Sequence, residues 1–337
     1  MIINYNFKDK ELNIKVNNFD FIRLLLAVFV YFGHWNILTQ FESENIFFNL
    51  HSHSVNLFFI ISGFLIFWSF ENDQNNKNFF IKRFFRIFPL YFIIIFLQTL
   101  FFIIYSDGKF FDIVKYFISN TLFLNFLAPT VGSVFNTFPE NAINGSLWTL
   151  KNEVVFYAMV PFLFYAYKKW GSKVFFGLYI LSVVYMFIID YLGMDKLNVQ
   201  YPAQLRLFLV GILLYIFFDK LEKINLYFLS AVALVLLFLF NKYDYFYFVF
   251  YPLCIGTLVV FLVYVIKIRK ISFDFSYSFY ILHFPVIQLF LYFGINPSNP
   301  VISFFVIFVV VLVLSYISEF YIEKKFINIG KKFLKRY

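Results

Sequence analysis

The chain has 337 residues, of which 62% are hydrophobic and 14% charged, and its formal net charge is +9. A soluble domain averages about 25% charged residues, so this composition excludes an ordinary soluble protein. Apolar runs long enough to cross a hydrocarbon core of about 30 Å recur along the whole chain. The sequence therefore predicts an all-α fold: a single domain over residues 1–337, built as a polytopic membrane bundle of about ten helices.

Ten segments have the hydropathy of membrane spans. They are 19–38, 55–70, 87–106, 146–167, 174–190, 203–218, 225–240, 246–266, 277–293 and 300–318. The first begins at Phe19 and has no small-residue cleavage site behind it, so we expect a span there and not a cleavable signal peptide. Cys254 is the only cysteine in the sequence, which excludes an intrachain disulfide.

The basic residues between these spans predict the orientation of the chain. If the N-terminus is cytoplasmic, the loops on that side carry 21 Lys and Arg residues, and the opposite loops carry four: Lys109, Lys115, Lys196 and Lys242. An excess of basic residues in short loops is typical of the cytoplasmic side. We therefore expect both termini in the cytoplasm, in a bacterial inner membrane, with the basic loops facing anionic lipid headgroups and not nucleic acid.

Segment 107–145 is long and partly apolar, and we interpret it as a re-entrant or interfacial pair of short helices on the outer face. A full span at this place would raise the number of spans to eleven and would invert the orientation of everything that follows. The distribution of basic residues disfavours that alternative.

The first span carries two ionisable residues, Arg23 and His34, eleven positions apart. Eleven residues at about 100° each return to nearly the same face of a helix, and they rise by roughly 16 Å. Ionisable groups inside a membrane usually face a protein interior or an aqueous cavity. The structural alternative is that Arg23 reaches the headgroups or pairs with Asp20, while His34 caps the outer end of the helix.

Further ionisable residues accompany the later spans. Residues 144–164 carry Glu153 with Lys151 and Trp148 near the outer face. Ordered by expected depth, the outer group is His34, Lys151, Glu153 and Arg206, and the cytoplasmic group is Arg23, Arg83, Arg86 and His283. A basic cytoplasmic cluster and an outer acid–base cluster predict a substrate that crosses the bilayer or reacts within it.

Several of these residues also have simpler explanations. Trp148 has the position of an interfacial anchor, Lys151 that of a lysine reaching the outer interface, and Arg83 and Arg86 that of topological charges. We expect Ser62 and Gly63 to allow close helix packing.

Two other groups of residues also have structural interpretations. We expect Glu319 and Glu323 to pair with Lys324 and Lys325 at the inner membrane edge. His51 and His53 invite a metal interpretation, but they lack nearby acidic or cysteine partners, so we expect no metal.

In order and spacing, five motifs resemble acyltransferase family 3, whose members acylate cell-surface polysaccharides. They are Arg23 and His34 after Asp20 in the first span, FFIISGFLI at 58–66, Arg83 and Arg86 within KRFFRIFPLY, GSLWTLKNEVVFY at 145–157, and SYSFYILHFP at 276–285. The resemblance covers nearly the whole chain and implies the stand-alone type without a periplasmic esterase-like domain. Two departures, Phe21 and Lys151, put the choice of substrate in doubt.

The resemblance implies a cytoplasmic acyl-CoA donor, most simply acetyl-CoA, and a hydroxyl acceptor on a cell-surface glycan or glycolipid. His34 would then be the general base, since a neutral imidazole suits that task. Glu153 would orient His34, and Arg23, Arg83 and Arg86 would bind the CoA phosphates. Trp148, Arg206 and His283 are expected to bind substrate.

The sequence leaves alternatives open. Direct transfer from thioester to hydroxyl is favoured over an acyl-histidine intermediate at His34, which the sequence does not exclude. A glycan or lipid-linked sugar transporter is the alternative from another class, although such folds often show two related halves and this chain shows none. A non-catalytic sensor ranks third, because nothing resembles an output domain.

Overall fold

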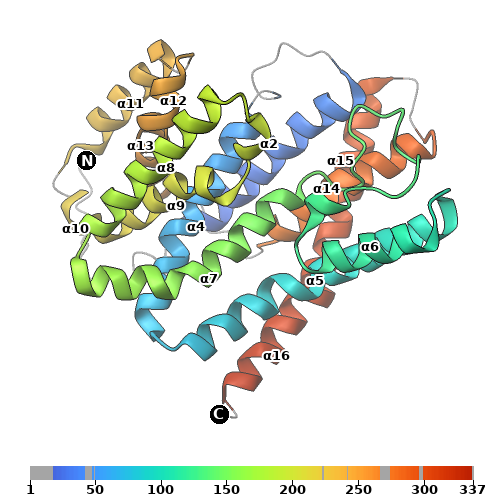
Figure 1. Ribbon diagram of the computed structural model, residues 1–337, viewed down its shortest axis with the longest axis horizontal. Coiled ribbons are helices and arrows are strands. Elements are labelled where there is room, and N and C mark those ends of the chain that lie inside the picture. Colours follow the sequence, from blue (N-terminus) through green and yellow to red (C-terminus); the bar gives the residue numbers. More distant parts are fainter. Residues whose placement is uncertain are drawn as a thin grey trace. The chain divides into compact units, whose positions relative to one another are not determined.

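The structure is a computed structural model that describes residues 18–41, 48, 50–221, 224–240, 242–265, 274–295 and 299–335. Every regular element among these residues is helical, which confirms the all-α prediction for the described part of the chain (Figure 1). The N-terminal segment 1–17 and most of the basic loop 267–276, both expected in the cytoplasm, lie outside the described residues.

The helices divide into two compact units. Within the described residues, unit 1 comprises 18–23, 56–74 and 155–265, and unit 2 comprises 24–55, 75–154 and 274–335. Three helices contribute to both units: α2 (Phe19–Thr39), α4 (His51–Asp73) and α7 (Leu147–Trp170). Each unit is described by itself below.

All ten predicted spans coincide with helices, but five helices of the described chain are long and apolar enough to cross a membrane: α2, α4, α5 (Asn76–Tyr105), α8 (Lys173–Tyr191) and the continuous segment Pro300–Leu334. Three shorter apolar helices, Tyr201–Ile216, Leu226–Phe240 and Tyr251–Tyr264, fall below that length. The chain is thus a multi-pass membrane protein by composition and helix length, and the number of ten spans stays a prediction.

Three predicted spans have other boundaries than expected. The span expected at 87–106 belongs to a helix that begins at Asn76, so Arg83 and Arg86 lie within α5 and not in a turn before it. The expected span 246–266 is divided into α12 (Asp244–Val249) and α13 (Tyr251–Tyr264), because Pro252 lies in the first turn of α13 and proline favours that position over a helix interior. The last span does not end at residue 318. α15 (Pro300–Ser318) continues through a π-helical turn at Glu319–Glu323 into α16 (Lys324–Lys335).

Unit 1 is built by close packing of α4 against α9 (Tyr201–Ile216). A Cβ on Gly63 would lie 2.1 Å from the carbonyl oxygen of Phe208, and one on Gly211 would lie 2.0 Å from that of Ile60. Only glycine permits this approach, which confirms the expected packing role of Gly63. Unit 1 is completed by α8, η2 (Asp195–Leu197), α10 (Phe218–Leu221), α11 (Leu226–Phe240), α12 and α13.

Unit 2 is organised around α5 and α14 (Ser276–Tyr292). In Figure 1 the early half of α5 lies beside α16 and its later half beside α6 (Phe110–Thr121). α14 packs against α15 and α5, and the Tyr277 hydroxyl donates to the Ile87 carbonyl oxygen over 2.8 Å. Tyr31 of α2 donates to the Phe304 carbonyl oxygen of α15 over 2.7 Å, so α2 belongs to the same packing.

The loop between α5 and α7, which the sequence places on the outer face (the outer loop), was expected to hold a pair of short helices. It contains one α-helix and one short 3₁₀ turn. α6 has 12 residues and a length of about 18 Å, too short to cross the membrane, and it is followed by η1 (Asn125–Leu127). Asp107 holds the loop closed by accepting from the Ser133 hydroxyl (2.6 Å) and backbone N–H (2.7 Å). These bonds, the hydroxyl first, lower the pKa of Asp107 below its usual range. Gly132 turns the chain here with a φ of +62°.

Candidate active site

His34 and His283 form a hydrogen-bonded pair in unit 2. Nδ1 of His34 lies 2.7 Å from Nε2 of His283, and the rings stack with centroids 4.9 Å apart. His283 is fully buried, whereas His34 is partly exposed. The expectation that the two lie at different depths is therefore wrong, since ring nitrogens 2.7 Å apart lie at the same depth.

The second ring nitrogen of His283 fixes the direction of this hydrogen bond. His283 Nδ1 lies 3.3 Å from the carbonyl oxygen of Phe279, which only accepts. A neutral His283 therefore carries its hydrogen on Nδ1, and its Nε2 accepts from Nδ1–H of His34. This assignment of tautomers follows from the hydrogen-bond partners. It leaves a lone pair on Nε2 of His34, which has no hydrogen-bond partner among the described residues.

A proline in α14 explains how the chain brings the loop before α7 to this pair. Pro285 has no backbone N–H, so the carbonyl oxygen of Ile281, four residues earlier, has no intrahelical donor. The side-chain amide of Asn144 donates to that oxygen over 3.1 Å. The next residue, Gly145, packs against the Phe284 ring, and the edge of that ring faces His34 at a centroid distance of 5.0 Å.

Glu153 lies on the face of α7 that meets α14. Thr149, one helical turn earlier, shares a hydrogen bond of 2.9 Å with the Tyr280 hydroxyl, and the Tyr280 and His283 rings are 5.6 Å apart. His34, however, makes no hydrogen bond or ion pair with Glu153 in the described structure; its ring nitrogen partner is His283. The role of Glu153 in orienting His34 stays a prediction.

The two arginines that the sequence placed in a basic turn lie within α5 and differ in their surroundings. Arg86 donates to Asp274 over 2.7 Å and lies 3.5 Å from Glu323. The guanidinium of Arg83 lies over the Phe79 ring, 5.5 Å from its centroid. The expected pairing of Glu319 with Lys324 is confirmed at 3.1 Å, whereas Glu323 faces Arg86 and not a lysine. Arg86 is thus already bound to carboxylates.

Arg23 and Arg206 belong to unit 1. Arg23 lies in the first turns of α2, half-buried and eleven residues before His34. Arg206 is 1% exposed and donates to the carbonyl oxygen of Ala203 in its own helix. Its guanidinium lies 5.6 Å from the centre of the Tyr247 ring, and among the described residues no carboxylate pairs with it. These contacts favour a packing role, and its role in substrate binding stays a prediction.

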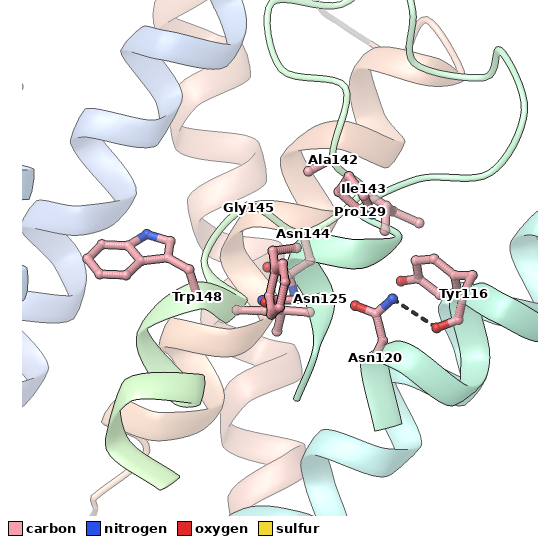
Figure 2. A pocket seen from close by; sticks show the side chains of 11 residues that line it. Tyr116, Asn120, Asn125, Pro129, Ala142, Ile143, Asn144, Gly145 and Trp148 are labelled. Atoms are coloured by element: carbon pink, nitrogen blue, oxygen red, sulfur yellow. Dashed lines mark hydrogen bonds between the residues drawn. The ribbon is translucent and has the colours of Figure 1, made fainter. Parts of the chain in front are cut away.

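Trp148 and Lys151 lie at the start of α7, beside a cavity between the outer loop and that helix. Trp148 is one of the residues that line the cavity (Figure 2). The Lys151 ammonium lies over the ring of Phe126, another lining residue, 4.9 Å from its centroid. Trp148 thus lies at a cavity, and its role in substrate binding stays a prediction.

His51 is a neighbour of His34 that the sequence interpretation missed. Its ring centroid lies 6.2 Å from that of His34, and Gly33 leaves the room for it, since a Cβ there would lie 2.3 Å from Cβ of His51. The only sequence feature that indicated this contact is the position of HSHSVNL shortly after the first span. Within the part of the chain that the structure describes, no group of three or more His, Cys, Asp or Glu side chains is arranged to hold a metal ion.

Comparison with known proteins gives one family and three relatives. Residues 16–320 match the family described as an acyltransferase domain, acyltransferase family 3. The O-acetyl transferase of Shigella phage Sf6 is 29% identical over 335 residues, which cover 93% of this chain and 97% of that protein. No solved structure matches the chain.

The other two relatives align over part of their length. Nodulation protein 10 of Rhizobium leguminosarum bv. viciae is 32% identical over 168 residues, 46% of each chain. Peptidoglycan O-acetyltransferase OatA of Listeria monocytogenes is 27% identical over 176 residues, 46% of this chain and 27% of OatA. The alignments thus span less than half of these two proteins.

Proposed function

Because this chain belongs to acyltransferase family 3, we propose that it is a membrane O-acyltransferase that moves an acyl group, most simply acetyl, from cytoplasmic acyl-CoA to a hydroxyl of a cell-surface glycan or glycolipid. Two relatives support the acetyl group, since their names describe O-acetyl transfer, and one of them aligns over nearly its full length. The name of OatA supports a cell-envelope acceptor. The place of action is the inner membrane.

The observation that carries this proposal is the His34–His283 pair. A hydroxyl is a weak nucleophile until a base removes its proton. His34 offers the lone pair on Nε2 because His283 holds the hydrogen of His34 on Nδ1. His283 thus acts as a positioning residue, in the way that an orienting carboxylate fixes the histidine of an acyl-transfer triad.

The reaction follows from these groups. Nε2 of His34 takes the proton of the acceptor hydroxyl as its oxygen attacks the carbonyl carbon of the thioester. The new C–O bond forms, the C–S bond breaks, and the CoA thiolate receives the proton from His34. We favour this direct transfer over an acyl-histidine intermediate. Glu153, on the α7 face that meets α14, favours the imidazolium that exists between the two proton transfers.

Arginines supply the phosphate contacts of the donor. Guanidinium groups bind phosphate through several charge-assisted hydrogen bonds. We assign this role to Arg83, and the same role of Arg23 stays a prediction from the sequence. Arg86, held by Asp274 and Glu323, contributes by anchoring the start of α5 and meets phosphate only if it exchanges these carboxylates.

The test is an acyl-transfer assay on the purified full-length protein in lipid nanodiscs. Radiolabelled acetyl-CoA and cell-envelope polysaccharide are mixed, and alkali-labile label on the polysaccharide is counted. His34→Gln keeps size and hydrogen bonding but cannot accept a proton, so transfer should fall about 100- to 10,000-fold. A wild-type protein that moves glycan across vesicle membranes without consuming thioester would establish the transporter alternative instead.

A further inference from the structure

The outer loop and the start of α7 line a half-open cavity that the catalytic scheme above does not use. Its volume is about 140 Å³, which corresponds to about five water molecules at about 30 Å³ each. Figure 2 shows Tyr116 and Asn120 on one side of it and Asn144, Gly145 and Trp148 on the other. This is the scale of one monosaccharide ring.

Two of the residues that line this cavity, Asn120 and Asn125, carry amide oxygens without a donor among the described residues. Asn120 uses both amide hydrogens on the carbonyl oxygens of Tyr116 (2.9 Å) and Ala128 (2.8 Å), and its Oδ1 accepts nothing within the described chain. Oδ1 of Asn125 is buried and likewise lacks a donor there. A buried acceptor without a donor is costly, so a ligand that brings hydroxyl groups is favoured.

The lining also disfavours some ligands. None of the described residues that line the cavity is charged, and the ammonium of Lys151 nearby lies over the Phe126 ring, so the lining itself provides no cation for the phosphates of CoA or another anion. The ring of Phe126, which is 57% exposed, provides a flat apolar surface beside the amides. Flat apolar surfaces combined with a few polar groups suit a neutral polyol whose ring has an apolar face.

A single aromatic ring separates this cavity from His34. Gly145 lines the cavity and packs directly against the Phe284 ring, whose edge faces His34 at 5.0 Å between centroids. Gln288 of α14 fixes the loop by donating to the carbonyl oxygens of Glu140 (2.8 Å) and Ala142 (2.9 Å). The cavity is therefore held rigidly to the helix that carries His283.

We infer that the cavity between α6, η1 and the start of α7 is a subsite for one neutral sugar ring of the glycan acceptor, with Asn120 and Asn125 accepting from its hydroxyls. The inference rests on the proposed function for the identity of the acceptor. It places the ring next to the one that reacts, with Phe284 between them.

Protection of an engineered cysteine tests this subsite without any acyl donor. Ala142→Cys is introduced in a Cys254→Ser background, and its labelling by a neutral methanethiosulfonate reagent is timed in nanodiscs. The probes are methyl glycosides of neutral hexoses and N-acetylhexosamines, inorganic phosphate, and hexanol as an apolar occupant. Asn136→Cys, an exposed position of the same loop outside the cavity, is the matched control.

We expect at least one methyl glycoside, at a concentration about nine times its Kd, to slow labelling of Ala142→Cys about tenfold, with no effect of phosphate and no effect at Asn136→Cys. Adding Asn125→Leu should abolish the protection. The inference is overturned if no glycoside protects, if hexanol alone protects, or if both cysteines are slowed equally.

A kinetic measurement tests the subsite without the engineered cysteine, in case the cysteine variant does not fold. Asn125→Leu alone should raise the KM for the polysaccharide about tenfold more than the KM for acetyl-CoA, and equal changes would contradict the subsite. Protection without any acyl transfer would instead count against the proposed function while leaving the subsite in place, so the two failures are distinguishable.

Discussion

Arg206 in unit 1 and the His34–His283 pair in unit 2 are both ionisable groups surrounded by apolar helices. The guanidinium of Arg206 is bound by a carbonyl oxygen of its own helix and the face of Tyr247. In the His pair, His34 donates to His283, and His283 donates to the carbonyl oxygen of Phe279. These two hydrogen bonds use three of the four ring nitrogens and leave Nε2 of His34 available. Burial alone therefore does not identify a catalytic group. A ring nitrogen with an unused lone pair, oriented by the hydrogen bonds of its partner, indicates a catalytic group better.

The largest effect is expected at His283, where two variants distinguish a role in orienting His34 from a role in packing alone. His283→Phe keeps an aromatic ring but removes the acceptor for His34, and transfer should fall about 100- to 1,000-fold. His283→Gln places an amide oxygen near the position of Nε2 and should recover part of that loss. Acyl transfer by the purified variants is the measurement.

The double variant sharpens the same point. His34→Gln with His283→Phe should be little worse than His34→Gln alone, because residues that act as a unit are not additive. If the loss of transfer in the double variant equals the product of the two single losses, His283 has only a packing role. Equal losses for His283→Phe and His283→Gln would lead to the same conclusion.

The next effect distinguishes the two arginines of α5. Arg83→Ala should raise the KM for acetyl-CoA about 10- to 100-fold while turnover at saturating donor is kept, since phosphate contacts act on binding. Arg83→Lys should recover only part, because lysine lacks the fork of donors.

Arg86→Ala should lower stability more than donor affinity. It leaves Glu323, which is 2% exposed, without its cation, and we expect a loss of about 1–3 kcal/mol after allowing for the partial exposure of Arg86. The measurement is thermal unfolding of Arg83→Ala and Arg86→Ala. Identical unfolding profiles and identical KM values for acetyl-CoA would show that the two arginines have the same role.

A smaller effect is expected at Gly145. A Cβ there would lie 2.7 Å from the Phe284 ring, so Gly145→Ala should press this ring toward His34 and lower turnover about tenfold. Gly177→Ala in α8 is the matched control, because nothing lies within 4 Å of its Cβ position. Unchanged turnover in Gly145→Ala would show that Phe284 moves freely.

The smallest effect is expected at Arg206. Replacing a buried charge by an apolar side chain of similar volume is often neutral for stability, so Arg206→Met should fold and retain transfer within about threefold. A large rise in the KM for the polysaccharide would instead support the substrate-binding role predicted from the sequence. Arg206 would then be a functional group like the His34–His283 pair, and not a packing group.

The helical fold was predictable because hydropathy reports burial in lipid directly. The ten expected segments all coincide with helices, and the close packing at Gly63 follows from its size. The break between α12 and α13 was signalled by Pro252, but proline is common enough near helix starts that its position alone does not decide between a break and a kink.

The candidate site was predictable only in part. His34 stands out because an ionisable residue is costly in an apolar run. Its partner does not, since His283 lies 249 residues away and hydropathy carries no information on the depth at which α14 begins. The cavity beside Asn125 had no sequence signal, because it is formed by backbone turns of a loop that reads as partly apolar.

The bond from Asn144 to Ile281 has a consequence for biogenesis. The two residues are 137 positions apart, so the ribosome releases the outer loop and α7 long before it makes the acceptor carbonyl. Until α14 enters the membrane, the Asn144 amide has no partner on it, Gly145 has no ring to pack against, and His34 has no His283. The histidine pair and its contact with the outer loop are therefore completed together, late in insertion, when α14 joins the bundle.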